Sequence, residues 1–415
     1  MCYTAPGIFP RRDRDLAAFN IFCYGHGIFF TVLQTLLMFG FFLEWRRDRR
    51  VCRGQAKPTH SGPPTHSGPP AHSGPPAHGG HISLIIPVHN EALRMKGLLH
   101  SLLAQDYPAE IIFVDDCSDD ESPAMLAEFA GRMENCRIIT LTGNPGPNRK
   151  QYALSRGIAE ARGDYLLFTD ADCEASPGWI RAMARRMDDT AVGAAIGPVF
   201  KKKQGRGFFF LYQCYDHAIR YNYLAGAIGL GAAGGGFGNN LIISRAALDS
   251  VGGYDAVPPS PTEDAALVSL IRSQGKYRVR AIALPDAVVE TVAEKTWRGF
   301  INQTLRWNNG GLFSPELMTR FNYNLLMLVI STGILAIPLL PFFPALWPMP
   351  AGVLMVMIEN TIAAFGLFRK KLPPGGPLNL GYALTLLFTP VYFTLMTIMG
   401  YCGIKTTWKN KRVVR

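Results

Sequence analysis

The sequence has little charge for its length, and it lacks the cysteine patterns of metal-binding and redox proteins. Charged residues make up 18% of its 415 residues, whereas apolar residues make up 48% and gather in blocks. The eight cysteines are scattered, with no CxxC pair and no zinc spacing of cysteine and histidine. Because scattered cysteines of this kind are usually reduced, we expect the soluble part of the chain to lie in the cytoplasm.

The positive charge of the chain is placed beside apolar segments. The formal net charge is +11, which suits nucleic acid, an anionic membrane surface or an anionic substrate as a partner. Arg46, Arg47, Arg49 and Arg50 follow the first apolar block, and residues 201–203 are three lysines before an aromatic run. This placement favours a lipid headgroup surface, so we expect a membrane partner and no nucleic acid.

Residues 16–45 form an apolar block long enough to cross a bilayer, which takes roughly 20 helical residues. The block ends in Glu-Trp-Arg-Arg rather than at a small-residue cleavage site, which predicts a retained membrane anchor over residues 1–50. Since the heavier arginine cluster follows the block, the positive-inside rule places the next part of the chain in the cytoplasm. We therefore expect an integral protein of the cytoplasmic (inner) membrane.

Residues 51–80 contain a six-residue repeat, Thr-His-Ser-Gly-Pro-Pro and its variants. Proline and glycine at this density do not build a packed core, which predicts a flexible linker. His60, His66, His72 and His78 recur every six residues and could form a weak metal-binding tract. The linker interpretation is favoured, because ordering a disordered chain around a metal gains little.

Short apolar runs alternate with helical patterns over residues 81–293. The runs at 82–88, 111–114, 137–141 and 165–169 predict strands. Helical patterns follow the first strand to about residue 105 and cover residues 125–133 and 151–161. This alternation predicts an α/β domain with a largely parallel sheet, in which ligands bind beyond the carboxyl ends of the strands.

The chain becomes apolar again over residues 322–403, before a basic tail at 404–415. Residues 325–343, 353–368 and 380–401 are three candidate membrane segments. Three crossings would leave the basic tail on the side opposite the soluble domain, against the charge rule. We therefore expect one segment to be re-entrant or interfacial, and the prolines around the first two segments favour an irregular path there.

Paired carboxylates follow two of the predicted strands. Asp170 and Asp172 come directly after the strand at 165–169, and two aspartates at this spacing can present oxygens to Mg²⁺ or Mn²⁺ together with substrate phosphates. Taken alone, such a pair is more often a solvated turn. Asp115 and Asp116 follow the strand at 111–114, where a lone motif of this kind would most often cap a helix.

Basic, acidic and glycine-rich segments lie farther along the chain. Arg149 and Lys150 precede a helix and could face a diphosphate. Glu263 and Asp264 follow Thr262 before an apolar helix, where a threonine cap and the helix dipole would account for them. The glycine-rich loop at 234–240 has neither a dinucleotide fingerprint nor a P-loop lysine, which favours a substrate-lining loop. A glycine fingerprint is also missing after the first strand, which disfavours a dinucleotide oxidoreductase.

Two aromatic stretches complete the set of candidate elements. Gln303, Arg306 and Trp307 share one helix face within residues 294–321, where they could contact a phosphate and a sugar or anchor an interfacial helix. Residues 208–223 form an aromatic-rich helix that is suited to the headgroup layer of a membrane. Burial in the protein core is the alternative for this second helix.

Five of these motifs occur in a characteristic order. They are Ile-Ile-Pro-Val-His-Asn-Glu, Val-Asp-Asp-x-Ser, Asp-Ala-Asp, Thr-Glu-Asp and Gln-x-x-Arg-Trp. In this order the chain resembles the family 2 glycosyltransferases over about residues 81–313, and most of all the membrane-bound branch with cellulose and hyaluronan synthases and lipid glycosyltransferases. The resemblance implies a GT-A-type, Rossmann-like nucleotide-sugar-binding domain with a mixed, largely parallel sheet, flanked by transmembrane and interfacial helices.

The resemblance also implies roles for the matching residues. Asp116 would read the nucleotide base, and Asp170 and Asp172 would bind the diphosphate and an Mg²⁺ or Mn²⁺ ion. The other residues expected at the donor are Lys150, Gln303, Arg306 and Trp307. Asp264 would be the catalytic base. The residues expected at the acceptor are Asn239, Asn240, Glu263 and Trp307.

These roles predict an inverting, metal-dependent transfer of a hexose from a nucleotide-sugar, a UDP-sugar in our interpretation, to an acceptor. A membrane-delivered lipid of the glycolipid, polyprenol or carotenoid type is the favoured acceptor. A processive polysaccharide synthase is the alternative, although a single amino-terminal span weakens the case for a polymer channel. A non-catalytic sensor would be expected to have lost Asp172 or Asp264, and both are present.

Overall fold

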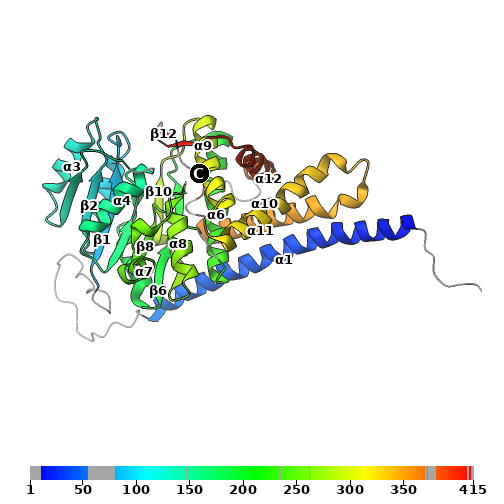
Figure 1. The fold of residues 1–415 in the computed structure, drawn as a ribbon, viewed down its shortest axis with the longest axis horizontal. Coiled ribbons are helices and arrows are strands. Elements are labelled where there is room, and N and C mark those ends of the chain that lie inside the picture. Colours follow the sequence, from blue (N-terminus) through cyan, green and yellow to red (C-terminus); the bar gives the residue numbers. More distant parts are fainter. Residues whose placement is uncertain are drawn as a thin grey trace, which may run out of the picture.

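The computed structural model describes residues 11–54, 80–145, 148–232, 235–260, 262–369, 372, 380–408 and 411–412. The four histidines of the predicted linker and the last residues of the basic tail lie outside these ranges. An α/β domain lies at one end of the molecule, and long helices extend from it at the other (Figure 1). The helix α1 (Arg11–Gly54) runs beside the domain and then away from it.

A seven-stranded sheet forms the centre of the α/β domain. In spatial order its strands are β3 (Cys136–Thr140), β2 (Glu110–Asp115), β1 (Ile82–Val88), β4 (Tyr165–Phe168), β8 (Leu241–Ser244), β6 (Val192–Ile196) and β9 (Arg278–Ala281). Neighbouring strands pair in parallel except where β8 pairs with β4 and β6. The predicted mixed, largely parallel sheet is therefore confirmed.

The four predicted strands are present with small shifts at their ends. The strand at 82–88 has the predicted bounds, and the other three differ by one residue at one or both ends. Along β1, Leu84 and Ile86 pack into one apolar cluster and Ile85 into another. Because both faces of the sheet are covered, these strands appear in the sequence as continuous apolar runs.

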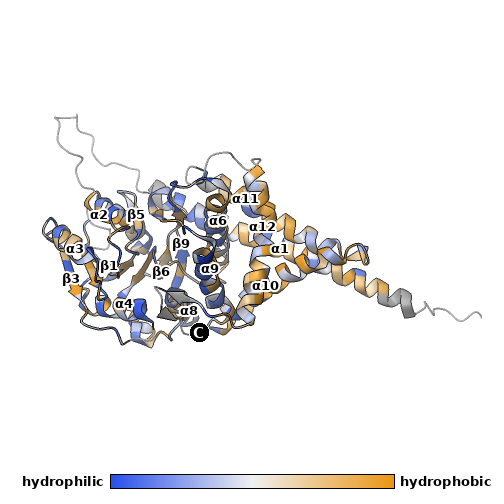
Figure 2. Cartoon of the chain, turned by 90° about the horizontal axis from the view of Figure 1, so that it is seen from above, coloured by the Kyte–Doolittle hydropathy of each residue, from blue (hydrophilic) through white to orange (hydrophobic). Residues whose placement is uncertain are grey.

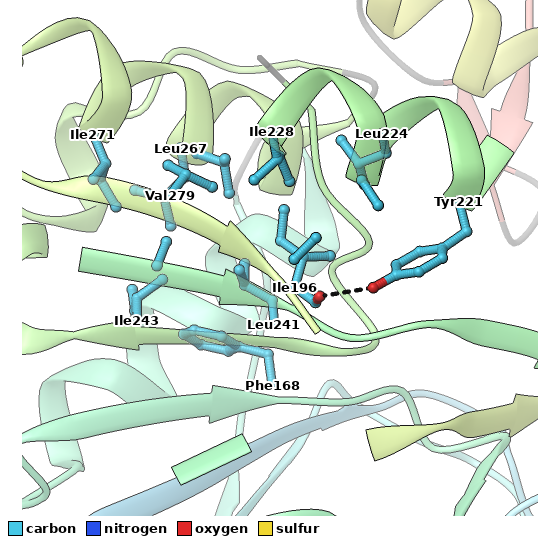
Figure 3. Packing of buried hydrophobic residues seen from close by; sticks show 14 of the residues in the cluster. Phe168, Ile196, Tyr221, Leu224, Ile228, Leu241, Ile243, Leu267, Ile271 and Val279 are labelled. Atoms are coloured by element: carbon cyan, nitrogen blue, oxygen red, sulfur yellow. Dashed lines mark hydrogen bonds between the residues drawn. The ribbon is translucent and has the colours of Figure 1, made fainter. Parts of the chain in front are cut away.

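Helices cover both faces of the sheet. One face carries α2 (Lys96–Leu103), α3 (Ser122–Ala130), α5 (Trp179–Ala184) and the short 3-10 helix η1 (Arg185–Asp188). The other face carries α4 (Arg149–Glu160), α6 (Gly207–Gly229), α7 (Arg245–Ser250) and α8 (Glu263–Ser273). Figure 3 shows side chains of α6 and α8, among them Leu224 and Leu267, packed on Ile196 and Leu241 of the sheet.

A second, three-stranded sheet lies beside the first, at the edge where the strand β4 ends. It consists of β5 (Cys173–Ala175), β10 (Val289–Thr291) and β7 (Val199–Lys201), with β10 in the middle. The strand β10 is antiparallel to β5 and parallel to β7. Short 3-10 helices, η2 (Tyr254–Ala256) and η3 (Pro285–Ala287), occur in the loops of the domain. Since β5 begins directly after Asp172, this sheet fixes the position of that aspartate.

The long helices outside the domain are apolar (Figure 2). They include α10 (Leu317–Ala336), α11 (Pro348–Phe368) and α12 (Leu380–Tyr401), which follow α9 (Trp297–Leu312). Together with α1, these three are long and apolar enough to cross a membrane. The tail forms a small hairpin of β11 (Thr407–Trp408) and β12 (Lys411–Arg412).

The prolines near the first two segments do not interrupt the helices α10 and α11. Pro338, Pro341 and Pro344 lie in the turn between α10 and α11, which contains η4 (Ile337–Leu339) and η5 (Pro344–Leu346). Pro348 and Pro350 lie in the first turn of α11. Proline is tolerated in turns and in the first turn of a helix, because the missing N–H is not needed there. The prolines therefore mark a hairpin between two regular helices.

The aromatic helix α6 is buried rather than placed in the headgroup layer. Tyr212, Tyr215 and Tyr221 are fully buried. The hydroxyl of Tyr221 donates to the carbonyl oxygens of Ile282 at 2.6 Å and of Ile196 at 3.4 Å, the second bond being drawn in Figure 3. The burial arises because α6 is enclosed by the sheet, α1, α11 and α12, so the alternative interpretation holds.

The helix α12 lies across the α10–α11 hairpin, at the end of the hairpin nearest the α/β domain. Near its start, Tyr382 packs edge-on against Phe365 at the end of α11, with ring centroids 4.7 Å apart. At its end, the hydroxyl of Tyr401 donates to Asn324 near the start of α10. Those two ends of an antiparallel hairpin lie on the same side, and Figure 1 views α12 nearly along its axis. The helix α12 therefore does not run parallel to the other three.

Two features attach α1 to the α/β domain, and the first is a close helix crossing. A methyl group added at Gly40 of α1 would overlap the carbonyl oxygen of Gly226 in α6, and one at Gly229 would overlap the carbonyl oxygen of Gly40. Small residues of this kind allow two helix backbones to approach closely. The crossing therefore depends on the absence of side chains at these three positions.

The second feature is a buried cluster of charges. Glu44 and Asp48 of α1 are almost inaccessible to solvent and pair with Arg186 at 3.2 and 3.0 Å. Glu44 also accepts from the backbone N–H of Ala281 at 3.2 Å, and Asp48 from that of Ala283 at 2.5 Å. Each charge is thus compensated by partners from the other element, as buried ions require.

Replacing Arg186 by methionine is expected to destabilise the protein strongly. The substitution keeps much of the side-chain volume but removes the cation paired with the buried carboxylate of Asp48, and loss of one partner of a buried ion pair typically costs about 3–5 kcal/mol. Glu44 keeps Arg47 and Arg280 as partners. The measurement is the free energy of unfolding in detergent micelles. The matched control is Arg185→Met, at a neighbour that makes none of these contacts. Equal stability of the two variants would contradict the assignment of the cluster as the attachment of α1.

Candidate active site

One cavity of about 500 Å³ joins the α/β domain to the long helices. It lies at the carboxyl edge of the sheet, beyond the ends of β1, β2 and β4. The strand order reverses between β1 and β4, and open α/β sheets bind ligands at such a reversal. The predicted site residues that line this cavity are Asp116, Lys150, Asp170, Asp172, Asn239, Glu263, Asp264, Gln303, Arg306 and Trp307.

Asp116, after β2, is held by two side chains. One carboxylate oxygen accepts from Asn144 Nδ2 at 2.8 Å, and the other accepts from Arg149 Nε at 2.7 Å. The hydrogen bond and charge of Asp116 raise the pKa of Arg149 against the opposing effect of burial. Asp116 therefore lines the cavity in a fixed orientation, which differs from the helix cap that a lone motif would suggest.

Lys150, in the first turn of α4, connects two acidic groups from different elements. Its ammonium nitrogen is 2.6 Å from Asp170 Oδ1 and 3.9 Å from Glu263 Oε1. Burial alone would lower the pKa of Lys150, but the charges of Asp170, Glu263 and Asp264 outweigh it and raise the pKa. The lysine is therefore a permanent cation at the centre of the polar half of the cavity.

Asp172 lies between the two sheets, with 22% of its side chain exposed. Its carboxylate accepts from Thr291 Oγ1 at 3.3 Å and is 4.0 Å from Arg94. Among the described residues, no three histidine, cysteine, aspartate or glutamate side chains converge to hold a metal by themselves. One or two aspartates in an open cavity nevertheless fit Mg²⁺ or Mn²⁺, which often take further ligands from substrate phosphates and water.

Asp264, in the first turn of α8, is fixed by backbone groups. One oxygen accepts from the N–H of Gly238, and the other accepts from the N–H of Ala265 at 2.8 Å. A methyl group at Gly238 would lie 2.8 Å from this carboxylate, so the glycine leaves the space that Asp264 occupies. The glycine-rich loop therefore positions the aspartate that the sequence assigns as the base.

The preceding residues do not form the expected helix cap. Thr262 occupies the cap position, but its side chain makes no capping hydrogen bond. Glu263 is buried and accepts from Asn148 Nδ2 at 3.3 Å. Burial raises the pKa of Glu263, although the Lys150 charge opposes the effect. The pair of acidic residues therefore faces the cavity instead of stabilising an exposed helix end.

Gln303, Arg306 and Trp307 line the cavity from α9, as their helical spacing predicts. The ring of Trp307 meets His217 edge-on, with centroids 5.4 Å apart. The guanidinium of Arg220 lies 5.6 Å from the same ring. These contacts fix the cavity-lining face of α9 against α6.

The two predicted asparagines have different positions. Asn239 lines the cavity, and its backbone oxygen accepts from Thr169 Oγ1 at 3.0 Å. Asn240 is fully buried away from the cavity. Its amide donates to the carbonyl oxygens of Pro198 and Ala287 at 2.8 Å, and its oxygen accepts from Trp179 at 2.9 Å. The expected acceptor contact of Asn240 is therefore wrong, because its polar atoms are used in the core.

Several cavity residues were missed by the sequence analysis. Lys201 was interpreted as part of a lipid-facing lysine run, yet it is buried beside the cavity, and burial lowers its pKa. His217 and Arg220 of α6 also line the cavity, and Arg220 pairs with Asp216 at 2.7 Å. The sequence signal for these residues was the presence of charged side chains within an aromatic helix. Charged residues are buried only when they are paired or functional, so this signal could have indicated a site.

The other half of the cavity is lined by the long apolar helices. Its walls include Phe30 and Gln34 of α1, Leu326, Met327 and Ile330 of α10, Val356, Met357 and Asn360 of α11, and Phe393 of α12. A single space thus has charged walls at the sheet and mostly apolar walls between the long helices. This arrangement can bring a polar substrate and an apolar substrate together.

Comparisons with known proteins agree with this geometry. Residues 83–252 match the family model of Glycosyl transferase family 2. The chain is 25% identical over 347 residues to a probable glycosyltransferase, YdaM, of Bacillus subtilis, with 80% of this chain and 76% of that protein covered. It is 22% identical over 275 residues to a beta-monoglucosyldiacylglycerol synthase of Trichormus variabilis, with 63% of this chain and 57% of that protein covered.

A solved structure has the same fold. The mannosyltransferase PcManGT from Pyrobaculum calidifontis, solved in complex with GDP-Man and Mn²⁺, matches with a TM-score of 0.52 at 18% identity. The match covers 90% of this chain and 98% of that one. The motifs, the sheet and these matches agree on the GT-A fold. Residues 83–252 form a domain of glycosyltransferase family 2, and the chain is an enzyme, a glycosyltransferase that moves a sugar from a nucleotide-sugar.

Proposed function

We propose that this enzyme transfers a hexose from a UDP-sugar to a lipid acceptor, with inversion, at the cytoplasmic face of the membrane. The observation that carries the proposal is the single cavity, which extends from Asp172 and Asp264 to the apolar walls of α1, α10 and α11. A water-soluble donor suits the charged half, and a lipid suits the apolar half. The name of the Trichormus relative, a diacylglycerol glucosylation enzyme, supports a lipid acceptor.

The donor binds at the carboxyl edge of the sheet. Asp116 and the elements around it hold the nucleoside, and Lys150 and Arg306 provide positive charge for the diphosphate. An Mg²⁺ or Mn²⁺ ion held by Asp172, with Asp170 beside it, would neutralise charge on the departing diphosphate. The Mn²⁺ in the PcManGT complex supports this expectation. Trp307 forms the wall between the donor and the acceptor.

Asp264 acts on the acceptor hydroxyl. Its carboxylate takes the hydroxyl proton while the hydroxyl oxygen forms a bond to the anomeric carbon. The bond from that carbon to the diphosphate oxygen breaks, and the nucleoside diphosphate leaves with the electron pair. The two backbone N–H donors orient the carboxylate toward the cavity. General-base assistance of this kind contributes about 10²–10⁴-fold to the rate.

The path of α12 supports a membrane topology of three crossings. In this topology α1, α10 and α11 cross the bilayer, and α12 lies along the cytoplasmic surface. Its outward face is a stripe of apolar residues, including Leu384, Leu387 and Leu395, that suits contact with lipid. The chain then returns to the cytoplasm after α11, next to Arg369, and the basic tail stays on the same side as the active site.

The Asp264→Asn variant is expected to lose transfer by at least about 10²-fold while it still binds UDP. Asparagine keeps the shape of the side chain but cannot accept the proton. The assay incubates membranes with radiolabelled UDP-hexose and measures label in the organic phase, and Asp249→Asn on the exposed side of α7 is the control. Full turnover by Asp264→Asn would eliminate this residue as the base, and label in a water-soluble polymer would indicate a polysaccharide synthase.

Removal of divalent cations is expected to stop transfer, since the diphosphate would leave without charge neutralisation. Chelation followed by addition of Mg²⁺ or Mn²⁺ tests this expectation, with recovery measured as the initial rate. An Asp172→Asn variant should require a higher metal concentration for half-maximal rate. Unchanged rates in excess chelator would show that the cationic side chains suffice.

Cys402 provides a test of the proposed topology. This residue directly follows α12 and is exposed. A membrane-impermeant maleimide should label it in inside-out vesicles but not in right-side-out vesicles. The signal assigned to Cys402 is the label lost in Cys402→Ser under the same conditions. Labelling only from the outside would mean that α12 crosses the membrane.

A further inference from the structure

One face of α1 carries arginines whose charges the fold does not use. Arg46, Arg49 and Arg50 follow the apolar block of the helix and are exposed. Their spacing of three and four residues places them on the same side of the helix. Within the described part of the chain, no carboxylate forms an ion pair with any of the three. This exposed face therefore presents a concentrated positive charge.

The opposite face of the same two turns is used for attachment to the α/β domain. Glu44 and Asp48 are buried there and pair with Arg186. Arg47 also belongs to this side, since its guanidinium pairs with Glu44. The run of arginines in the sequence is thus divided by the helix, and only part of it remains available to a partner outside the protein.

Aromatic rings hold two of the exposed arginines in place. The guanidinium carbon of Arg46 lies 5.6 Å from the centre of the Phe42 ring, and that of Arg49 lies 4.8 Å from the centre of the Trp45 ring. Each ring is one turn earlier on the helix, so both guanidinium groups lean toward the apolar part of α1. Stacking uses the flat face of a guanidinium and leaves its N–H edge available for the oxygens of a phosphate group.

The position of these groups along α1 matches the surface of a bilayer. Phe39 and Phe42 are 53% and 44% exposed, and Phe42 is the last exposed large apolar residue among the described side chains of the helix. Trp45 follows, and tryptophan is typical of the boundary between hydrocarbon and headgroups. If α1 crosses the bilayer up to this point, the stacked guanidinium groups lie in the headgroup layer, where lipid phosphates are found.

The charge balance at this end of α1 indicates which headgroup fits. Residues 44–50 contain four arginines and two acidic residues, and Arg186 and Arg280 of the domain pair with those acids. Six positive charges against two negative charges leave a surplus of four. A zwitterionic headgroup brings a positive charge with its phosphate and offsets none of this surplus, whereas each acidic headgroup offsets at least one charge.

We propose that Arg46, Arg49 and Arg50 form a binding surface for the phosphate groups of acidic phospholipids. The proposal requires that α1 crosses a bilayer. It does not depend on the donor or the acceptor, because none of the three arginines lines the cavity. An arginine near an anionic membrane surface gains about 1 kcal/mol, which corresponds to about fivefold in affinity. The surface should therefore select acidic phospholipids from a mixture with zwitterionic ones.

The first test measures which lipid lies next to Trp45. The full-length protein is placed in nanodiscs of phosphatidylcholine that contain a small fraction of brominated phosphatidylglycerol or, separately, brominated phosphatidylcholine. Bromine quenches tryptophan fluorescence, and the signal of Trp45 is the difference between the wild type and Trp45→Phe. The relative association constant should be at least about fivefold higher for phosphatidylglycerol. Equal quenching by the two lipids would overturn the proposal, and this comparison needs no change to the arginines.

The second test removes the charges. The triple variant Arg46→Gln, Arg49→Gln, Arg50→Gln should lose the preference for phosphatidylglycerol. The matched control is Arg132→Gln, Arg156→Gln, Arg162→Gln, which removes the same charge from exposed positions on the α/β domain and should keep the preference. Loss of the preference in both triple variants would mean that net charge alone attracts the lipid, and would refute a defined surface on α1.

A free phosphate ion has the same chemistry as the headgroup and is distinguished by competition. Inorganic phosphate, added at constant ionic strength, should leave the quenching by brominated phosphatidylglycerol unchanged. Displacement of the lipid by phosphate would assign the surface to a soluble anion and overturn the lipid assignment. Sugar transfer is not measured in any of these experiments, so their failure leaves the proposed function intact, and failure of that function leaves the lipid surface intact.

Discussion

The attachment of α1 to the α/β domain is the constraint on which the active site depends. The cavity has charged walls from the domain and apolar walls from the long helices, so its shape requires the two parts to keep a fixed relation. The buried carboxylate of Asp48 requires Arg186, because an unpaired ion in this position is strongly unfavourable, and Arg186 and Arg280 of the domain both pair with Glu44. Electrostatics at the junction therefore determine the geometry of a site farther along the same helix.

Within the charged half, Lys150 has a similar linking role at shorter range. It connects the aspartate after β4 to the glutamate at the start of α8, and these elements are distant in sequence. The carboxylates gathered there would repel one another without a central cation. Because its pKa is raised, Lys150 keeps its charge through the physiological pH range. In the proposed mechanism the same charge would face the diphosphate of the donor, so that folding and substrate binding would use one group.

The sheet and most of the cavity residues could be predicted from the sequence, because the sequence patterns of covered strands and of the aspartates after them fit few other structures. A fully covered strand such as β1 must be a continuous apolar run, and aspartates after such strands must meet at one edge. The pattern of α6 was ambiguous, since an aromatic helix with lysines before it suits both a membrane surface and a buried position. Asn239 and Asn240 are adjacent, and the hydrogen bonds of the second one to Trp179, Pro198 and Ala287 separate their roles. Hydropathy alone also does not show that α12 lies across the hairpin of α10 and α11 rather than along it.

The contact of Gly40 with Gly226 and Gly229 has a consequence for how the protein can vary. None of these three glycines is a predicted site residue. A single added carbon at the crossing would nevertheless act as a wedge between two helix backbones. The wedge would tilt α1 about the ion-pair cluster and displace the part of the helix that lines the cavity, which includes Phe30 and Gln34. Alanine at one of these glycines would therefore change acceptor use before it changed donor binding.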